Sequence, residues 1–131
     1  MDEHKLSQLP LFSTLGKREH RELATLTDEV DIREGEELLH QGGFAHEFMV
    51  IIDGRAEVVR DGEKVAELGP GDFLGEMAAL DKGHRNATVV ASASMTVAVM
   101  TARDLRHIAR EMPEVDAQLR KAARERCPIA A

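Results

Sequence analysis

The sequence has little cysteine, few aromatic residues, no excess of positive charge and no long apolar run, and each shortage excludes a class of protein. The single cysteine, Cys127, cannot form an internal disulfide. The longest largely apolar stretch, 87–100, is interrupted by serines and threonines and is shorter than the ~18 residues that a membrane-spanning helix needs. The charged N-terminus leads into no apolar segment, so no secretory signal is predicted and we expect a cytoplasmic protein.

Aromatic residues and charge argue against nucleic-acid binding. Four phenylalanines are the only aromatic residues, so an aromatic platform for stacking single-stranded bases has no evident parts. With 17 basic and 24 acidic residues the formal net charge is −7, which is the wrong sign for a general nucleic-acid surface. The six histidines are scattered without metal-ligand spacing, so we expect them at the surface and expect no metal site.

The length of 131 residues predicts one domain. The residue pattern indicates a helical zone at each end of the chain. Leu23 and Leu26, three residues apart in a charged stretch, indicate a short amphipathic helix in the N-terminal zone, 1–27. Thr101 and Asp104 have the spacing of a helix cap, and Pro113 suits the first turn of a further helix. Two C-terminal helices are therefore predicted within 102–126, the second over roughly 113–126 with an apolar stripe made by Val115, Leu119, Ala122 and Ala123.

The zone between the helices, 28–101, consists of short β-prone runs separated by glycine turns. Asp53-Gly54 and Asp61-Gly62 are strong hairpin signals, because both central residues of a type I′ turn need positive φ. They predict a meander of the runs 48–52, 55–59 and 63–68, and the runs 88–91 and 95–101 follow. The predicted fold class is mainly β with flanking helices: an antiparallel β-roll, or jelly roll, with an N-terminal helix and two C-terminal helices.

A long segment between two of these runs has the residues of an anion site. Glycines at 69, 71 and 75 let backbone amides approach a ligand, and a helix beginning beside glycines favours negative charge. Arg85 places a planar guanidinium that can hold a phosphate bidentately, and Glu76 adds a hydrogen-bond acceptor. This set suits a ligand that carries both a phosphate and a free hydroxyl.

These residues resemble the phosphate-binding cassette of the cyclic nucleotide-binding domain family, which we place at 73–89. The family pattern F-G-E-(L/M)-A-(L/A)-L, a short spacer and R-x-A-(T/S)-V is filled here by Phe73, by 75–80 and by 85–89. Further family features lie in register at 11–12, 35–36, 41–42, 48–51, 54–58 and 68–72, so the resemblance covers nearly the whole chain.

The resemblance implies a site for cAMP or cGMP and no other cofactor. In the family, the position of Arg85 binds the exocyclic phosphate oxygens and that of Glu76 accepts from the ribose 2′-hydroxyl. Amides near Gly75 and Met77, and after the arginine, complete the phosphate shell, and the base lies on strand residues beneath the C-terminal helix. The candidate ligand-binding residues are Gly75, Glu76, Met77, Ala78, Arg85, Asn86, Ala87, Val65 and Leu68.

The resemblance leaves several alternatives open. Asn86 stands where the family usually has Ala, Ser or Thr, so the choice between cAMP and cGMP stays open, with cAMP as the default. We expect a stand-alone sensor rather than an enzyme, which signals by repacking of the C-terminal helices. The output is a protein partner acting in trans, our preference, a homodimer built along the C-terminal helices, or a nucleotide-buffering role. The rivals are a degenerate fold that serves as a protein-interaction module and, ranked lower, a small cupin-type jelly-roll enzyme, for which the histidine cluster is lacking.

Overall fold

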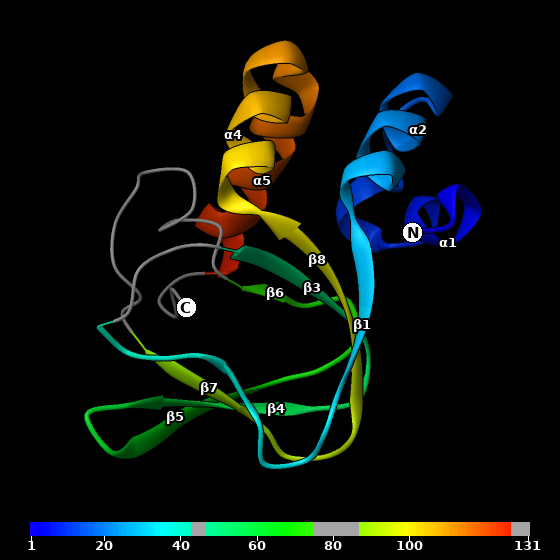
Figure 1. Cartoon of the computed structure of the whole chain (residues 1–131). Helices are drawn as coiled ribbons and strands as arrows, with labels where there is room; N and C mark the ends of the chain where they lie inside the picture. Colours follow the sequence, from blue (N-terminus) through cyan, green and yellow to red (C-terminus); the bar gives the residue numbers. More distant parts are fainter. Residues whose placement is uncertain (43–46, 75–86, 127–131) are drawn as a thin grey trace.

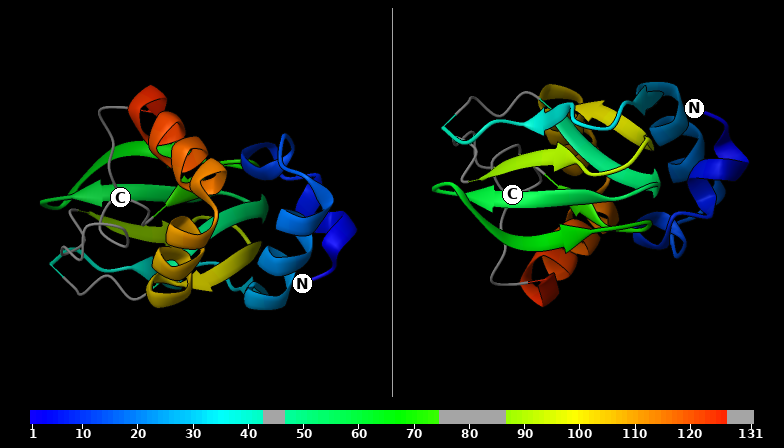
Figure 2. Two further views of the ribbon diagram at one scale, coloured as in Figure 1. Left: turned by 90° about the horizontal axis from the view of Figure 1, so that it is seen from above. Right: turned by 90° about the horizontal axis from the view of Figure 1, so that it is seen from below.

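The chain folds into two four-stranded antiparallel sheets covered on one side by helices. The computed structural model describes residues 1–42, 47–74 and 87–126. One sheet has the strand order β1-β8-β3-β6 and the other β2-β7-β4-β5. The helices lie over the first sheet, and the second sheet lies on its opposite side (Figure 1), an arrangement that the views from above and below share (Figure 2). The predicted jelly roll with flanking helices is confirmed.

The elements are grouped along the chain into a helical zone, a β zone and a second helical zone. The helical elements are α1 (Glu3–Ser7), the 3-10 helix η1 (Pro10–Phe12), α2 (Lys17–Leu26), α4 (Ala102–Glu111) and α5 (Pro113–Arg126). The strands are β1 (Asp28–Ile32), β2 (Glu37–Leu39), β3 (Glu47–Asp53), β4 (Ala56–Arg60), β5 (Glu63–Leu68), β6 (Phe73–Leu74), β7 (Thr88–Ala91) and β8 (Met95–Thr101). In the part of the chain that the structure describes, no helix is both long enough and apolar enough to cross a membrane.

The two Asp-Gly turns connect different kinds of strand pairs: one joins two paired strands and the other joins strands of different sheets. The predicted three-stranded meander is therefore wrong. At Asp61-Gly62 both residues have positive φ, 52° and 82°, and the turn joins the paired strands β4 and β5 as predicted. Asp53-Gly54 instead carries the chain from one sheet to the other, because β3 pairs with β6 and β8 whereas β4 pairs with β5 and β7. At this turn only the glycine has positive φ.

Strand β3 separates two apolar cores because its side chains alternate between the two faces of the sheet. Phe48 and Val50 belong to the core under the helices, whereas Met49 and Ile51 belong to the core between the sheets. The ring of Phe48 lies 6.2 Å from that of Phe73 on β6, centroid to centroid, in the helix-side core. The consecutive apolar run in the sequence is therefore a strand buried on both faces.

The N-terminal zone contains three short helices where the sequence indicated one. Asp2 caps α1 by accepting hydrogen bonds from the backbone N–H groups of His4 and Lys5, and Pro10 begins η1. One predicted surface histidine is buried: His20 is 8% exposed, and its Nε2 donates to the Phe12 carbonyl oxygen at 2.6 Å. This bond satisfies both polar groups and ties α2 to η1, which explains why a histidine is tolerated there.

The C-terminal helices follow the prediction closely. The hydroxyl of Thr101 accepts a hydrogen bond from the Asp104 N–H and caps α4, and Pro113 begins α5. Val115 and Leu119, the first half of the predicted apolar stripe, are fully buried in the helix-side core. Helix α5 packs against α4 and η1, so this half of the stripe already has a partner within the chain.

Candidate functional site

Strands β6 and β7 bracket the segment that carries the predicted cassette. Strand β6 pairs with β3, so it enters from the helix-side sheet, whereas β7 leaves between β2 and β4 in the other sheet. The segment therefore connects the two sheets. Six of the predicted ligand-binding residues lie outside the described residues: Gly75, Glu76, Met77, Ala78, Arg85 and Asn86.

The structure describes the other three predicted site residues and brings two of them together. Ala87, fully buried, and Leu68, 6% exposed, belong to the core between the sheets. Val65 on β5 is 43% exposed and lies outside that core. The β4–β5 register shifts at this point, because Val58 pairs with Ala66 while Val59 pairs with Lys64, which leaves Val65 without a partner in the register.

The turn before β6 holds the start of the segment in place. Pro70 followed by Gly71, at φ +91°, has the residue order and backbone sign of a type II turn. The Asp72 carboxylate accepts from the Gly69 N–H at 2.8 Å, which closes the turn from the inside. Ile51 exchanges hydrogen bonds of 2.8 Å with this turn, accepting from the Gly71 N–H and donating to the Asp72 carbonyl, so the turn extends the β3–β6 pairing.

A polar latch holds the other end of the segment. The Thr88 hydroxyl, one residue after Ala87, accepts a hydrogen bond from the Gln41 N–H at 2.9 Å. The side chain of Gln41 also binds the β4–β5 turn: its Nε2 donates to the Asp61 carboxylate at 2.8 Å, and its Oε1 accepts from the Asp61 N–H at 2.9 Å. Gln41 thus joins the end of β2, the β4–β5 hairpin and the first residue of β7.

The role of this latch was not predicted from the sequence. Thr88 stands in the cassette motif and Gln41 in another family feature, but the two residues lie 47 positions apart and no periodicity links them. One signal could have indicated this contact: Thr88 follows the buried Ala87 at the start of a half-buried strand. A hydroxyl group in such a position needs a hydrogen-bond partner.

Removing the Thr88 hydroxyl is expected to destabilise the fold. The Thr88→Val variant keeps the side-chain shape but leaves the partly buried Gln41 N–H without its acceptor, so we expect the free energy of unfolding to fall by about 1 to 2 kcal/mol. Urea unfolding measures the change. The Thr88→Ser variant keeps the hydroxyl and is the matched control; equal destabilisation of both variants would show that the hydrogen bond contributes nothing.

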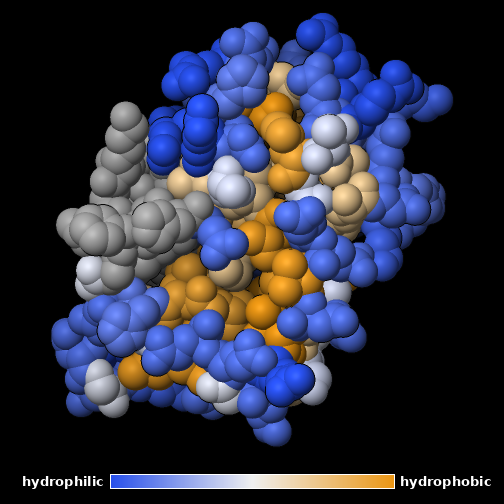
Figure 3. Space-filling model, viewed as in Figure 1, coloured by the Kyte–Doolittle hydropathy of each residue, from blue (hydrophilic) through white to orange (hydrophobic). Residues whose placement is uncertain are grey.

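The described residues also present an apolar surface. In the space-filling view, apolar side chains gather between the helices and the lower sheet of Figure 1, with polar residues around them (Figure 3). On the β4–β5 hairpin, the Lys64 ammonium lies 3.5 Å from the Glu57 carboxylate and 3.4 Å from that of Glu67. The described residues thus fix strands β6 and β7 by hydrogen bonds and leave an apolar wall between the helices and the lower sheet.

Comparison with known proteins agrees with this arrangement. The model of the cyclic nucleotide-binding domain family matches residues 29–112, from β1 through α4. A cAMP-dependent protein kinase regulatory subunit of Schizosaccharomyces pombe is 35% identical over 97 residues, which are 73% of this chain and 24% of that protein. A cyclic nucleotide-gated potassium channel of Rhizobium etli is 30% identical over 121 residues, which are 92% of this chain and 34% of that protein.

A solved structure extends the likeness to the whole fold. The N-terminal domain of a transcriptional regulator from Streptomyces coelicolor A3(2) has a TM-score of 0.73 and 29% identity, over 93% of this chain and 91% of that one. The chain spans less than two thirds of the curated relatives that it matches, 24% of the kinase subunit and 34% of the channel. The family match, the strand order and the cassette motif together show that this chain belongs to the cyclic nucleotide-binding domain family.

Proposed function

We propose that this chain is a sensor that binds cAMP or cGMP through the cassette at 73–89 and catalyses no reaction itself. The observation that carries the proposal is the cassette motif, with both Glu76 and Arg85, in a chain of this family. Anchored strands on either side of the segment support it further. Two relatives are named for dependence on or gating by a cyclic nucleotide, one of them for cAMP, which favours cAMP as the ligand.

The proposed roles of the site residues follow from the chemistry of a cyclic nucleotide. Arg85 would pair with the exocyclic phosphate oxygens, because a guanidinium donates two parallel hydrogen bonds to such a group. Glu76 would accept from the ribose 2′-hydroxyl. Backbone amides of Gly75, Met77 and Ala78, and those of Asn86 and Ala87, would complete the phosphate shell.

The base would lie against β5 and beneath the C-terminal helix. Val65 is exposed on that strand and so is accessible to a planar ring, whereas Leu68 is buried in the core between the sheets. Asn86 would determine whether the site prefers adenine or guanine, because its side-chain amide both donates and accepts hydrogen bonds.

The proposed signal is a repacking of α4 and α5 when the ligand binds. Leu119 holds α5 in the helix-side core, so movement of this helix requires its apolar contacts to be exchanged for others. A ligand drives such a change only by the difference between its affinities for the two arrangements. The signal would be received by a partner protein acting in trans, or by a second copy along the C-terminal helices.

Thermal unfolding in the presence of nucleotides tests this proposal. If cAMP or cGMP binds only the folded chain, a concentration of about 100 times the dissociation constant stabilises it by about 2.7 kcal/mol and raises the melting temperature. The linear nucleotide 5′-AMP is the control, and we expect no rise with it. If neither cyclic nucleotide raises the melting temperature, the pocket is silent and the domain is a protein-interaction module.

A further inference from the structure

The C-terminal helices carry a charge opposite to that of the rest of the chain. Of the 17 basic and 24 acidic residues, seven basic and five acidic ones lie in 102–126, a net charge of +2. The remaining ten basic and nineteen acidic residues give the rest of the chain a net charge of −9. Such a localised field of one sign on an oppositely charged molecule attracts a charged partner and orients it as it approaches.

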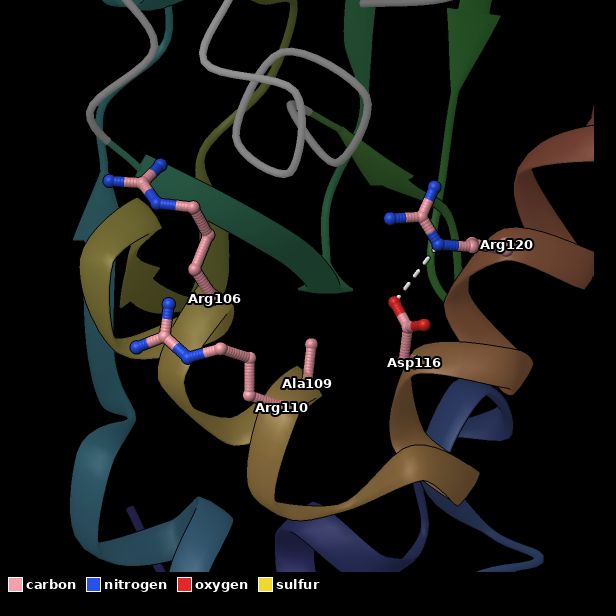
Figure 4. A pocket seen from close by; sticks show the side chains of 5 residues that line it. All are labelled: Arg106, Ala109, Arg110, Asp116 and Arg120. Atoms are coloured by element: carbon pink, nitrogen blue, oxygen red, sulfur yellow. Dashed lines mark hydrogen bonds and ion pairs between the residues drawn. The ribbon is translucent and has the colours of Figure 1, made fainter.

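Three of these seven basic residues line a cleft between α4 and α5 (Figure 4). The cavity has a volume of about 230 Å³ and is lined by Arg106, Ala109, Arg110, Asp116 and Arg120. Arg106 and Arg110 come from α4 on one side, with their guanidinium groups directed away from α5, and Arg120 extends from α5 on the other side (Figure 4). The small side chain of Ala109 lies between them, and we attribute the space in the cleft to it.

One guanidinium in the cleft is held in a fixed orientation. The Nε of Arg120 donates to the Asp116 carboxylate at 3.0 Å, one helical turn earlier in α5. The two terminal nitrogens of Arg120 point away from this carboxylate (Figure 4). Because the side chain of Arg120 is 47% exposed, these nitrogens can reach a group that enters from solvent.

A second hollow continues the cleft along α4. It has a volume of about 530 Å³, shares Arg110 with the first and is lined also by Thr101, Arg103, Asp104 and His107. Arg103, His107 and Arg110 are exposed and stand at positions i, i+4 and i+7, which place them on one face of the helix. The outer face of α4 is therefore a continuous ridge of positive and titratable side chains with a hollow on either side of Arg110.

We propose that this α4–α5 face binds an acidic segment of a partner protein, with one carboxylate side chain entering the cleft at the terminal nitrogens of Arg120 and a neighbouring carboxylate of the segment meeting Arg110 on the ridge along α4. The cleft is smaller than the roughly 300 to 1,000 Å³ of pockets that enclose a whole small molecule, so it suits a single side chain. A guanidinium fork matches a carboxylate in geometry and charge. The negative charge of the rest of the chain disfavours a long polyanion that would extend beyond the face.

Binding of a fluorescein-labelled oligoaspartate, followed by fluorescence anisotropy at low salt, tests this inference without any nucleotide present. The double variant Arg110→Gln/Arg120→Gln is expected to bind at least about tenfold more weakly than the parent. The matched control is Arg18→Gln/Arg21→Gln, which removes the same charge from exposed positions on α2 and is expected to change affinity less than about twofold. Equal losses in the two variants, or no saturable binding to the parent, would overturn the proposal.

A third variant tests the cleft from the opposite direction. In Asp116→Asn the competing carboxylate beside Arg120 is gone, so the oligoaspartate is expected to bind roughly two to five times more tightly. Glu22→Gln, which removes the carboxylate paired with Arg18 on α2, is its control and is expected to leave the affinity unchanged. A single-stranded oligonucleotide of equal charge that bound as tightly as the peptide, with the same response to the variants, would assign the face to nucleic acid and contradict the proposal.

Discussion

Replacement of Arg85 by alanine is expected to weaken cAMP binding by at least about a hundredfold, because two charge-assisted hydrogen bonds to one phosphate are lost together. We expect the variant to keep the stability of the fold, because the proposed role of Arg85 is to bind the ligand. Isothermal titration measures the affinity, and urea unfolding without nucleotide measures the stability.

Two further variants separate charge from geometry in this experiment. Arg85→Lys keeps the positive charge but loses the planar fork, so its affinity should lie between those of the parent and the alanine variant. Arg33→Ala removes an exposed arginine between β1 and β2 and should leave cAMP binding unchanged. An Arg85→Ala protein that bound cAMP as tightly as the parent would show that the cassette is wrongly assigned.

The variant Gly54→Ala is expected to lower the free energy of unfolding by about 3 to 5 kcal/mol. Gly54 has φ +96°, and a Cβ there would lie 2.5 Å from the Ser94 carbonyl oxygen and 2.7 Å from the Met95 Cα. Both neighbours are backbone atoms at the start of β8, which cannot move without disturbing the sheet. The loss is a large share of the roughly 5 to 15 kcal/mol by which domains of this size are stable.

Gly62→Ala is the matched control for this prediction. Gly62 also has positive φ, +82°, but a Cβ there would meet nothing within 4 Å. The variant should therefore show only the backbone strain, about 1 to 2 kcal/mol. Urea unfolding measures both losses in the free energy of unfolding. If the two variants lost the same amount, the contact of a Cβ at Gly54 with Ser94 and Met95 would have no energetic cost, which would contradict our description.

Most elements of the fold could be predicted because their signals are local. The runs 88–91 and 95–101 are the strands β7 and β8, and the Thr101 cap and Pro113 begin the two C-terminal helices. The exchange of strands between sheets could not be predicted in this way. An Asp-Gly pair favours a tight turn but does not specify which strands pair across it, and at Asp53-Gly54 the chain passes from β3, which pairs with β8, to β4, which pairs with β5 in the other sheet.

The same distinction between local and distant contacts applies to the site. The cassette is a nearly continuous motif, so its residues could be named from the sequence alone. The latch between Gln41 and Thr88 depends on a contact across 47 positions, and the burial of His20 depends on the carbonyl of Phe12. Neither partner has a sequence pattern that identifies the other. The basic cleft required the structure too, because Arg110 and Arg120 line one cleft only when α4 packs on α5.

Isothermal titration of the parent protein with cAMP, cGMP and the 2′-deoxy analogue of the tighter ligand tests the central claim most directly. The account predicts saturable binding of one cyclic nucleotide, and weaker binding of the deoxy analogue because Glu76 would lose its hydroxyl partner. Absence of binding heat with every nucleotide at several temperatures would contradict the claim.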